Sequence, residues 1–374
     1  MNHSLLFNRL CKFVLLFATT LFCITASAQT KPQPLKIGIA GLTHTHVHWL
    51  LGRQKADDIQ IVGIVEPNKE LAERYTKQHG YSMSIVYNTM EEMIVATKPE
   101  AVCAFGTIYD HLKVVETCAP LGIHVMVEKP LAVSWDHAMK MKQLAAKHQI
   151  HLLTNYETTW HPSNHLAYEM VKKDSIGTIR KIVVHDGHKG PKEIGVNKEF
   201  LDWLTDPVLN GGGAITDFGC YGANLVTWLS NGEKPISVFA ITQTLKPDVY
   251  PKVDDEATIV VEYKNRQAII QASWNWPVSR KDMEVYGVHG YFICENRNDV
   301  RFKITEEATE QKLKLEERPY PFNDPFALFA AVIRKQITLP AYDLSSLENN
   351  MLVMEILEAA KKSAKTGKRI YLKR

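Results

Sequence analysis

Cysteine is scarce in this sequence, and its spacing excludes two kinds of site. The 374-residue chain has six cysteines, and no two of them form a Cys-x-x-Cys pair. Zinc clusters and dithiol redox motifs need such closely spaced pairs. An oxidising compartment would permit a disulfide among the later cysteines, but their wide separation favours buried, unpaired thiols. These later cysteines are Cys103, Cys118, Cys220 and Cys294.

The apolar run near the N-terminus is too short to span a membrane. It extends from Phe13 to Ile24, whereas a transmembrane helix needs about 20 apolar residues. The basic residues Arg9 and Lys12 precede it, and Ala26-Ser27-Ala28 follow it. This order is typical of a secretory signal peptide with a small-residue cleavage site. We therefore expect residues 1–28 to be a signal peptide that is removed.

The same segment predicts the route and the destination of the chain. No pair of adjacent arginines precedes the apolar run, which favours general secretion over the twin-arginine route. Cys23 follows the bulky Phe22, so lipoprotein anchoring at Cys23 is disfavoured. The mature chain is expected to begin at Gln29, to be exported to the periplasm and to have no membrane attachment after cleavage.

Neither sign of charge is in large excess. The formal net charge is +3, and loss of Arg9 and Lys12 with the signal peptide lowers it to +1. Nucleic-acid-binding domains are much more basic, so no nucleic-acid partner is expected. Apolar residues make up 45% of the chain and charged residues 23%, as in ordinary globular proteins. The 346 residues after the signal peptide are enough for two domains.

The first half of the mature chain alternates short β-branched runs with helical segments. This rhythm is typical of βαβ units that build a parallel sheet. Asp110 is expected to cap a helix that stops at Gly122, and Ser134 to open a helix that reaches His148. We predict an α/β Rossmann domain over residues 35–155. Its strands are expected at residues 36–40, 60–65, 84–87, 101–105, 124–127 and 151–154.

The rhythm changes in the second half. One strand is expected at residues 179–185, and long strands with short turns dominate residues 236–317, which indicates a mostly antiparallel sheet. Helices are expected at residues 324–336 and 345–365. We predict an α+β domain over residues 156–374 with an open sheet, which binds substrate and joins subunits. The last helix is expected either to cover this sheet or to pack back on the Rossmann domain.

Large aromatic residues in these strands are expected to form an apolar face. An open sheet with helices on one side leaves its other side to be covered, and a second copy of the chain can cover it. Homo-oligomerisation through the sheet is therefore expected, with coverage by the terminal helices as the alternative. The aromatic residues are Phe239, Tyr263, Trp274, Trp276, Tyr286 and Phe292.

Two glycines are missing from the turn after the first predicted strand. A Rossmann domain has Gly-x-Gly-x-x-Gly there, whereas this chain has only Gly41, with Thr43 and His46 at the other two positions. Glu66 ends the second strand, where a carboxylate accepts hydrogen bonds from the adenosine ribose and repels a 2′-phosphate, so NAD is favoured over NADP. Gly41, Thr43, His44 and Glu66 are therefore candidate cofactor contacts.

The histidines of this turn support a different interpretation as well. His44 and His46 after a first strand resemble the metal-binding pair of zinc-dependent amidohydrolase barrels, with His48 as a further ligand and Lys129 as a bridging one. The further strand-end histidines that such a barrel needs are not evident, and the antiparallel second half conflicts with a parallel barrel. We therefore expect no metal ion.

The strongest local signal is Glu128-Lys129-Pro130 at the end of the fifth predicted strand. Ligands of open α/β sheets bind at this edge, and a proline keeps the preceding residue out of helical geometry. Lys129 is therefore expected to point into the crevice. Together with the Gly41 turn, Glu66 and His111, this triplet resembles the glucose-fructose oxidoreductase/inositol dehydrogenase family, often called Gfo/Idh/MocA. The resemblance covers nearly all of the mature chain.

The resemblance implies roles for several residues. In that family the lysine of the Glu-Lys-Pro motif contacts the nicotinamide ribose and the substrate hydroxyl, which implies this role for Lys129. It also implies cofactor contacts for Thr107, His111 and Glu128. Many members have an arginine after the sixth strand, and the corresponding Asn155-Tyr156-Glu157 lacks it.

A second motif, from Gly211 to Tyr221, also resembles the family. Members commonly end it with a histidine that acts as acid and base, whereas this chain has Tyr221, as the sugar oxidoreductase and dihydrodiol dehydrogenase branches do. Asp217 and Tyr221 are four residues apart, so they are expected on one face of a helix. A nearby Lys129 ammonium would lower the tyrosine pKa from its usual value of about 10. Lys129 and Tyr221 are thus the expected proton-transfer pair, and Asp217 orients the lysine or a substrate hydroxyl.

Four further residues are weaker candidates for substrate contacts: Asn155, Trp160, His185 and His188. Aromatic and imidazole groups suit the faces and hydroxyls of sugars, although a core role fits Trp160 equally well.

These features predict an exported oxidoreductase that transfers hydride between a nicotinamide cofactor and a hydroxyl carbon of a sugar, glycoside or cyclitol. Free NAD is scarce outside the cytoplasm, so the cofactor is expected to be tightly bound. The alternative is an NAD-assisted glycoside hydrolase or lyase, which oxidises a sugar carbon transiently without net redox change. A third possibility is a non-catalytic ligand sensor, because two glycines and the arginine are missing.

Overall fold

Six parallel strands form the first sheet of the molecule. The computed structural model describes residues 33–53 and 57–373, so the expected signal peptide lies outside the described residues. Along the sheet the order is β3-β2-β1-β4-β5-β6, which agrees with a Rossmann arrangement. The strands are β1 (Leu35–Ala40), β2 (Ile59–Val65), β3 (Val86–Tyr87), β4 (Ala101–Ala104), β5 (His124–Glu128) and β6 (Leu152–Asn155).

Apolar packing on both faces explains why these short runs form strands. On β1, Ile37 and Ile39 belong to one apolar cluster, while Val125 and Val127 of β5 belong to the cluster on the opposite face. Strands buried on both faces read as continuous apolar runs. The second of these clusters continues without a break into the core of the second sheet.

Helices connect the strands, and most of their predicted ends are observed. The Ser134 side chain accepts a hydrogen bond from His137 N, and Gly122 ends its turn at φ 71°. The expectation for Asp110 was wrong, because its side chain makes no cap and instead accepts a hydrogen bond from the Thr107 hydroxyl at 2.6 Å. The helices are α1 (Val47–Leu51), α2 (Lys69–His79), α3 (Met90–Thr97), α4 (His111–Cys118) and α5 (Trp135–His148).

The second sheet has nine strands within the described residues. Neighbouring strands are antiparallel except for β7 and β10, which pair in parallel. The order is β14-β13-β12-β11-β7-β10-β9-β8-β15. The strands are β7 (Ile179–Gly187), β8 (Ser237–Gln243), β9 (Glu256–Glu262), β10 (Gln267–Ser273), β11 (Arg280–Gly287), β12 (Tyr291–Cys294), β13 (Asp299–Lys303), β14 (Gln311–Lys314) and β15 (Ile370–Tyr371).

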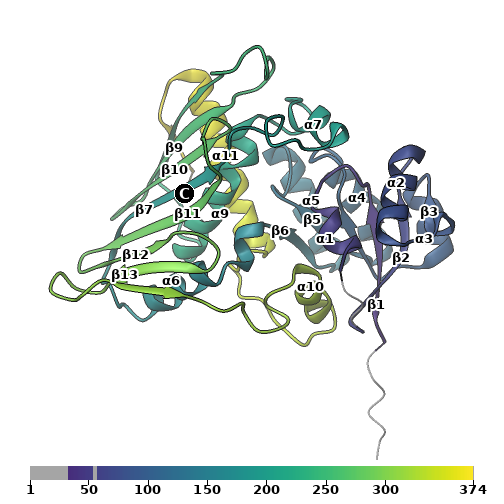
Figure 1. Cartoon of the computed structure of the whole chain (residues 1–374), viewed down its shortest axis with the longest axis horizontal. Helices are drawn as coiled ribbons and strands as arrows, with labels where there is room; N and C mark the ends of the chain where they lie inside the picture. The colour runs from purple at the N-terminus through teal and green to yellow at the C-terminus, as the bar shows by residue number, and fades with distance from the viewer. Residues whose placement is uncertain (1–32, 54–56, 374) are drawn as a thin grey trace, which may run out of the picture. The chain divides into compact units, whose positions relative to one another are not determined.

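Helices cover one face of this sheet. Helix α9 (Gly219–Leu229) packs on β7 and β10, and α11 (Leu347–Thr366) packs on α9 and β8; Figure 1 shows both behind the strands. At Gly222 the approach is close, since a Cβ there would lie 2.3 Å from Ile270. Strand residues that point to these helices are buried, as Ile259 and Val261 are, whereas Val260 on the other face is half-buried.

The expected aromatic face of the sheet was only partly right. Trp274 and Phe292 are fully buried and Tyr263 is 3% exposed, because the alternation of the strands directs the first two toward the covered face. Phe239 and Tyr286 are half-buried on the open face. The open face therefore carries fewer aromatic residues than expected, together with aliphatic and charged ones.

The helices near the C-terminus also contact the parallel sheet and its loops. Arg334, directly after α10 (Pro325–Ile333), pairs with Glu100 at 2.6 Å. Lys361 of α11 donates to the Val133 carbonyl at 2.9 Å. These contacts join the parallel sheet to the rest of the chain, and residues 34–374 form one compact unit. Two further helices are α6 (Pro162–Lys172) and α7 (Lys198–Leu204).

The four cysteines among the described residues are all buried and free. None of the helices among the described residues is both long enough and apolar enough to cross a membrane.

Candidate active site

Lys129 and Asp217 form a buried ion pair. Lys129 directly follows β5, before the cis peptide bond to Pro130. Its ammonium donates to the Asp217 carboxylate and, at 3.0 Å, to the Asp217 carbonyl. Trp274 Nε1 donates to the other carboxylate oxygen at 3.0 Å. Burial opposes both charges, yet each charge stabilises the other, so the pKa of Lys129 is raised and that of Asp217 is lowered.

Tyr221 lies between two ammonium groups. Its ring centroid is 5.1 Å from Lys129 Nζ and 5.0 Å from Lys281 Nζ. Asp217 ends helix α8 (Ala214–Asp217) and Tyr221 lies in the first turn of α9, so the motif spans two short helices instead of one. The side chains nevertheless converge on a cavity of about 160 Å³, which Lys129, Asp217, Tyr221 and Lys281 line together.

The expected lowering of the Tyr221 pKa was wrong for this state of the site. Burial raises the pKa of Tyr221 well above its usual value, and the negative charges of Glu157 and Asp217 raise it further. Lys129 does not offset this, because Asp217 already neutralises its ammonium. Tyr221 is therefore a neutral phenol and a proton donor at neutral pH.

Three charged residues near Tyr221 were missed by sequence reasoning. Lys281 of β11 pairs with Glu157, and this contact lowers the pKa of Glu157 to about 2 although burial opposes the shift. Asp186 of β7 is the register partner of Lys281. It is fully buried, and neither carboxylate oxygen has a partner among the described residues. Burial raises its pKa well above the usual range.

A signal for Asp186 does exist in the sequence. Every second residue of β7 points to the covered face, and these residues are Ile182, Val184 and Asp186. At the third of these positions the alternation predicts an apolar side chain, but the chain has an aspartate. Lys281 offers no such signal, because its neighbourhood depends on the pairing of β7 with β11.

The turn after β1 begins with a glycine in a left-handed backbone conformation. Gly41 has φ +80°, and a Cβ there would lie 2.8 Å from the backbone of Gly106, so only glycine fits. Glu66 accepts hydrogen bonds from Leu42 N and Asn68 N, each at 2.9 Å. Burial raises the pKa of Glu66. The carboxylate thus supports the turn and lies at the end of β2 as expected.

Residues from the second half of the chain contact this turn. Trp203 Nε1 donates to Thr43 Oγ1 at 3.1 Å, and the His44 ring lies 4.8 Å from the Phe200 ring. Glu199 pairs with Arg74 at 2.7 Å, and Asn197 donates to the Tyr75 hydroxyl. The segment 191–210, which contains α7, therefore crosses over the turn after β1 and helix α2. We call it the crossing segment.

A chain of hydrogen bonds surrounds Glu128. His46 Nδ1 lies 2.9 Å from one carboxylate oxygen, and Asn155 Nδ2 donates to the other at 2.8 Å. Trp160 Nε1 in turn donates to Asn155 Oδ1 at 3.0 Å. Although burial opposes the charge, His46, His44 and Asn155 lower the pKa of Glu128 to about 2. Asn155 and Trp160 are buried, and their hydrogen bonds support Glu128. A substrate contact of either residue stays a prediction.

Two predicted contacts lie away from the cavity. His111 is fully buried, its Nδ1 is 3.2 Å from the Leu131 carbonyl, and burial lowers its pKa to about 4. It therefore supports the loop after Lys129 through Nδ1. Its Nε2 has no hydrogen-bond partner among the described residues, and a cofactor contact of His111 stays a prediction. His185 bonds Asp282 across β7 and β11 at 2.9 Å, on the sheet face opposite to Asp186, because neighbouring residues of a strand alternate. His188 lines the cavity as predicted, and Thr107 lies at the end of β4, bonded to Asp110.

Two groups of side chains have metal-compatible spacing among the described residues. His44, His46 and Glu128 form one, and His185, Asp282 and Glu284 form the other. In the first group, His44 Nδ1 accepts from His46 N and His46 bonds Glu128. The barrel interpretation of these histidines was wrong, because the six parallel strands form an open sheet that is followed by antiparallel strands.

Comparison with known proteins places this geometry in a family. Residues 35–156 match the model of an oxidoreductase family with an NAD-binding Rossmann fold, and residues 165–293 match the GFO/IDH/MocA C-terminal domain. A trans-1,2-dihydrobenzene-1,2-diol dehydrogenase of Xenopus tropicalis is 28% identical over 225 residues, which are 58% of this chain and 62% of that protein. The alignment therefore spans less than two thirds of this relative.

Solved structures share the fold over most of the chain. An aldose-aldose oxidoreductase from Caulobacter crescentus superposes with a TM-score of 0.76 at 20% identity, over 91% of this chain and 100% of that one. An inositol dehydrogenase homologue from Azotobacter vinelandii, solved with NAD⁺, gives a TM-score of 0.79 at 17% identity, over 91% and 98%. With both of its domains matched, the chain belongs to the Gfo/Idh/MocA oxidoreductase family.

Proposed function

We propose that this protein is an oxidoreductase that transfers hydride between a nicotinamide cofactor and a hydroxyl carbon of a sugar or sugar-like alcohol. The observation that carries the proposal is the convergence of Lys129, Asp217 and Tyr221 on one cavity at the carboxyl edge of the parallel sheet. Interconversion of an alcohol and a carbonyl needs a group that transfers the hydroxyl proton, and Tyr221 beside the fixed Lys129 ammonium can be that group.

Gly41 in the turn after β1 and Glu66 after β2 fit a nicotinamide dinucleotide. Strand order reverses between β1 and β4, and ligands of open α/β sheets bind at that point. The absent Cβ of Gly41 leaves room for close approach of a ligand to the backbone, and Glu66 stands where a ribose hydroxyl needs an acceptor. When bound, the nicotinamide ring accepts or supplies the hydride.

Lys129 and Tyr221 have different roles at the substrate oxygen: Lys129 donates a hydrogen bond, and Tyr221 transfers the proton. An ammonium has three donors, and Asp217 accepts from Lys129 through its carboxylate and its carbonyl, which leaves one donor for the substrate oxygen. Tyr221 gives its proton to a carbonyl oxygen that becomes a hydroxyl, and takes the proton back in the reverse direction. Lys281 faces the same ring, with its charge held by Glu157.

Two features favour NAD and its tight retention. The carboxylate of Glu66 would repel the 2′-phosphate of NADP. The crossing segment contacts Thr43 in the turn after β1, which we call the cofactor turn, and Arg74 and Tyr75 on α2. It would therefore have to move before a bound dinucleotide leaves. A retained cofactor suits an exported enzyme, and the signal-peptide pattern of residues 1–28 supports export to the periplasm. N-terminal sequencing of the secreted protein should then begin at Gln29.

The decisive experiment uses the chain from Gln29 onward. Released small molecules are identified by mass spectrometry, and absorbance at 340 nm is followed while neutral sugars and glycosides are added. Stable reduction of NAD by a sugar supports the proposal. Cleavage of a glycoside while the cofactor returns to its oxidised state would instead support the hydrolase or lyase, and failure to bind any nucleotide would support the sensor.

A further inference from the structure

A second, larger cavity adjoins the catalytic cavity. Its volume is about 850 Å³, against about 160 Å³ for the catalytic one. His188 and Lys281 line both, so the two spaces meet at these side chains. Ligand pockets usually have roughly 300–1,000 Å³. The catalytic cavity alone is smaller than this range, whereas the two cavities together reach its upper end.

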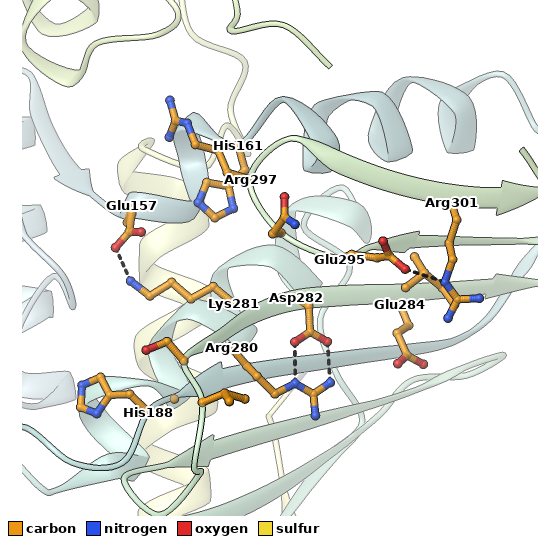
Figure 2. Close-up of a pocket in the computed structure, with 15 residues that line it drawn as sticks. Glu157, His161, His188, Arg280, Lys281, Asp282, Glu284, Glu295, Arg297 and Arg301 are labelled. Carbon is orange, nitrogen blue, oxygen red and sulfur yellow. Dashed lines mark hydrogen bonds and ion pairs between the residues drawn. The ribbon is translucent and has the colours of Figure 1, made fainter. Parts of the chain in front are cut away.

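The charges that line the larger cavity cancel one another. Four are positive and four are negative, and most are paired within the protein. Figure 2 shows Arg280 on Asp282, Arg301 on Glu295 and Lys281 on Glu157. Arg297 pairs with Glu317. An anionic ligand would therefore find no uncompensated cation in this wall. Paired guanidinium and carboxylate groups instead present donors beside acceptors, which suits hydroxyl groups because each hydroxyl donates and accepts.

His188 is a fixed donor where the two cavities meet. Gly190 N donates to His188 Nδ1 at 2.9 Å, so this nitrogen carries no proton. Burial lowers the pKa of His188 to about 4, so the ring is neutral at pH 7 and Nε2 carries the hydrogen. Together with the Lys281 ammonium, His188 thus supplies donors to an oxygen that lies between the two spaces.

We propose that the substrate is a neutral glycoside or disaccharide that spans both cavities. The reacting sugar lies beside Lys129 and Tyr221, and the second unit lies in the larger cavity between the paired charges of β11 and β13. His188 donates to the glycosidic oxygen or to a hydroxyl next to it. This inference rests on the proposed function, because it assumes that hydride transfer takes place beside Tyr221. A free monosaccharide fills only the smaller space.

Calorimetric titration tests the proposal without requiring turnover. The NAD⁺-loaded protein is titrated with maltose, cellobiose and lactose, with glucose and galactose as their single units, and with glucose 6-phosphate and glucuronate as acidic sugars. We expect at least one disaccharide to bind about tenfold tighter than either of its units, and tighter than both acidic sugars. If no disaccharide exceeds its units, or if an acidic sugar binds most tightly, the proposal is wrong.

Matched arginine variants locate the second unit. Arg301 lies on β13 in the wall of the larger cavity, and its partners Glu295 and Glu310 stay partly exposed to solvent when it is removed. Arg301→Ala should therefore fold. It should reduce the ratio of disaccharide affinity to single-sugar affinity about tenfold. Arg369→Ala removes a surface ion pair with Glu262 outside the cavity and should leave the ratio unchanged. Equal effects of the two variants would contradict the placement.

Absorbance at 340 nm, recorded on the same samples, separates the two claims. Selective disaccharide binding without any cofactor reduction would refute the proposed oxidoreductase activity but not the spanning site. Reduction by glucose or galactose alone, with no gain from a second unit, would refute the spanning site but not the activity.

Discussion

Tyr221 keeps its proton although two lysines face its ring. Each ammonium is held by a carboxylate, Lys129 by Asp217 and Lys281 by Glu157. The nearby groups therefore add little net positive charge, and desolvation of the phenolate dominates. Asp186, the register partner of Lys281 on β7, is buried, and burial raises its pKa. The Tyr221 phenol can thus donate its proton when a carbonyl is reduced. Oxidation of an alcohol first requires that Tyr221 lose this proton, which its raised pKa disfavours.

The raised pKa of Tyr221 predicts how oxidation of the alcohol depends on pH. Oxidation requires the phenolate, and the pKa of Tyr221 lies well above its usual value, so kcat/KM for oxidation should rise throughout the range from pH 6 to pH 9. Tyr221→Phe should lower kcat by about 10²–10⁴ and remove the pH dependence, with an unchanged circular dichroism spectrum. A profile that levels off near pH 7 would mean that another group is the base.

Glu66 should control the choice between NAD and NADP. Glu66→Gln keeps an oxygen that can accept from Leu42 N but removes the negative charge, so the ratio of the NADP⁺ to the NAD⁺ dissociation constant should fall about tenfold, which is about 1.4 kcal/mol. Fluorescence titration measures both constants. Glu70→Gln, at an exposed position of α2, is the control and should not change the ratio.

Glu128 should make the fold sensitive to acid. Its pKa is about 2 in the folded chain, below the ordinary 4.5, so its contribution to stability is complete above pH 4.5 and is lost as the pH falls toward 2. Glu128→Gln should therefore lose less stability than the wild type between pH 7 and pH 3. Urea unfolding at the two pH values measures the difference. Parallel losses in the two proteins would show that other groups cause acid unfolding.

At the level of elements, the crossing segment connects the antiparallel half of the chain to the cofactor turn. Trp203→Phe keeps the ring but removes the hydrogen bond to Thr43, so NADH should dissociate several-fold faster, because one of the bonds that hold the segment closed is lost. Stopped-flow fluorescence gives the rate. Trp135→Phe, in the first turn of α5, serves as the control, and equal rates for wild type and Trp203→Phe would exclude this role.

Elements with a strong local pattern were predictable, whereas contacts between distant elements were not. The β-branched runs of the parallel sheet, the Ser134 cap and the Gly122 turn follow from nearby residues. Lys129 and Asp217 were expected near each other because of motifs that resemble a known family. The pairing of β7 with β11, which places Asp186 beside the Lys281 that faces Tyr221, depends on register between strands far apart in the chain. The bond of His185 to Asp282 could not be predicted either, because the face of its strand was not assigned.

For the whole molecule, the open face of the antiparallel sheet is the surface at which we expect copies of the chain to associate. In the part of the chain that the structure describes, helices pack on one face. The other face carries Phe239, Val260 and Ile269, which are half-buried, beside Ile241, which is 56% exposed. We propose that a second copy covers this apolar part, next to strands whose outer residues line the larger cavity. Homo-oligomers commonly close such faces with two-fold symmetry.

A charge placed on this surface at Ile241 of β8 tests the association. Ile241→Glu should convert the assembly to monomers in sedimentation-velocity runs, because burying an unpaired carboxylate opposes the contact. Val95→Glu introduces the same charge on α3, at a side chain that is 77% exposed, and should leave the assembly intact. The monomeric variant should still bind NAD, since the cofactor turn and the crossing segment belong to the same chain. Unchanged sedimentation of Ile241→Glu would show that this face is not the interface, and loss of NAD binding on dissociation would mean that the partner completes the site.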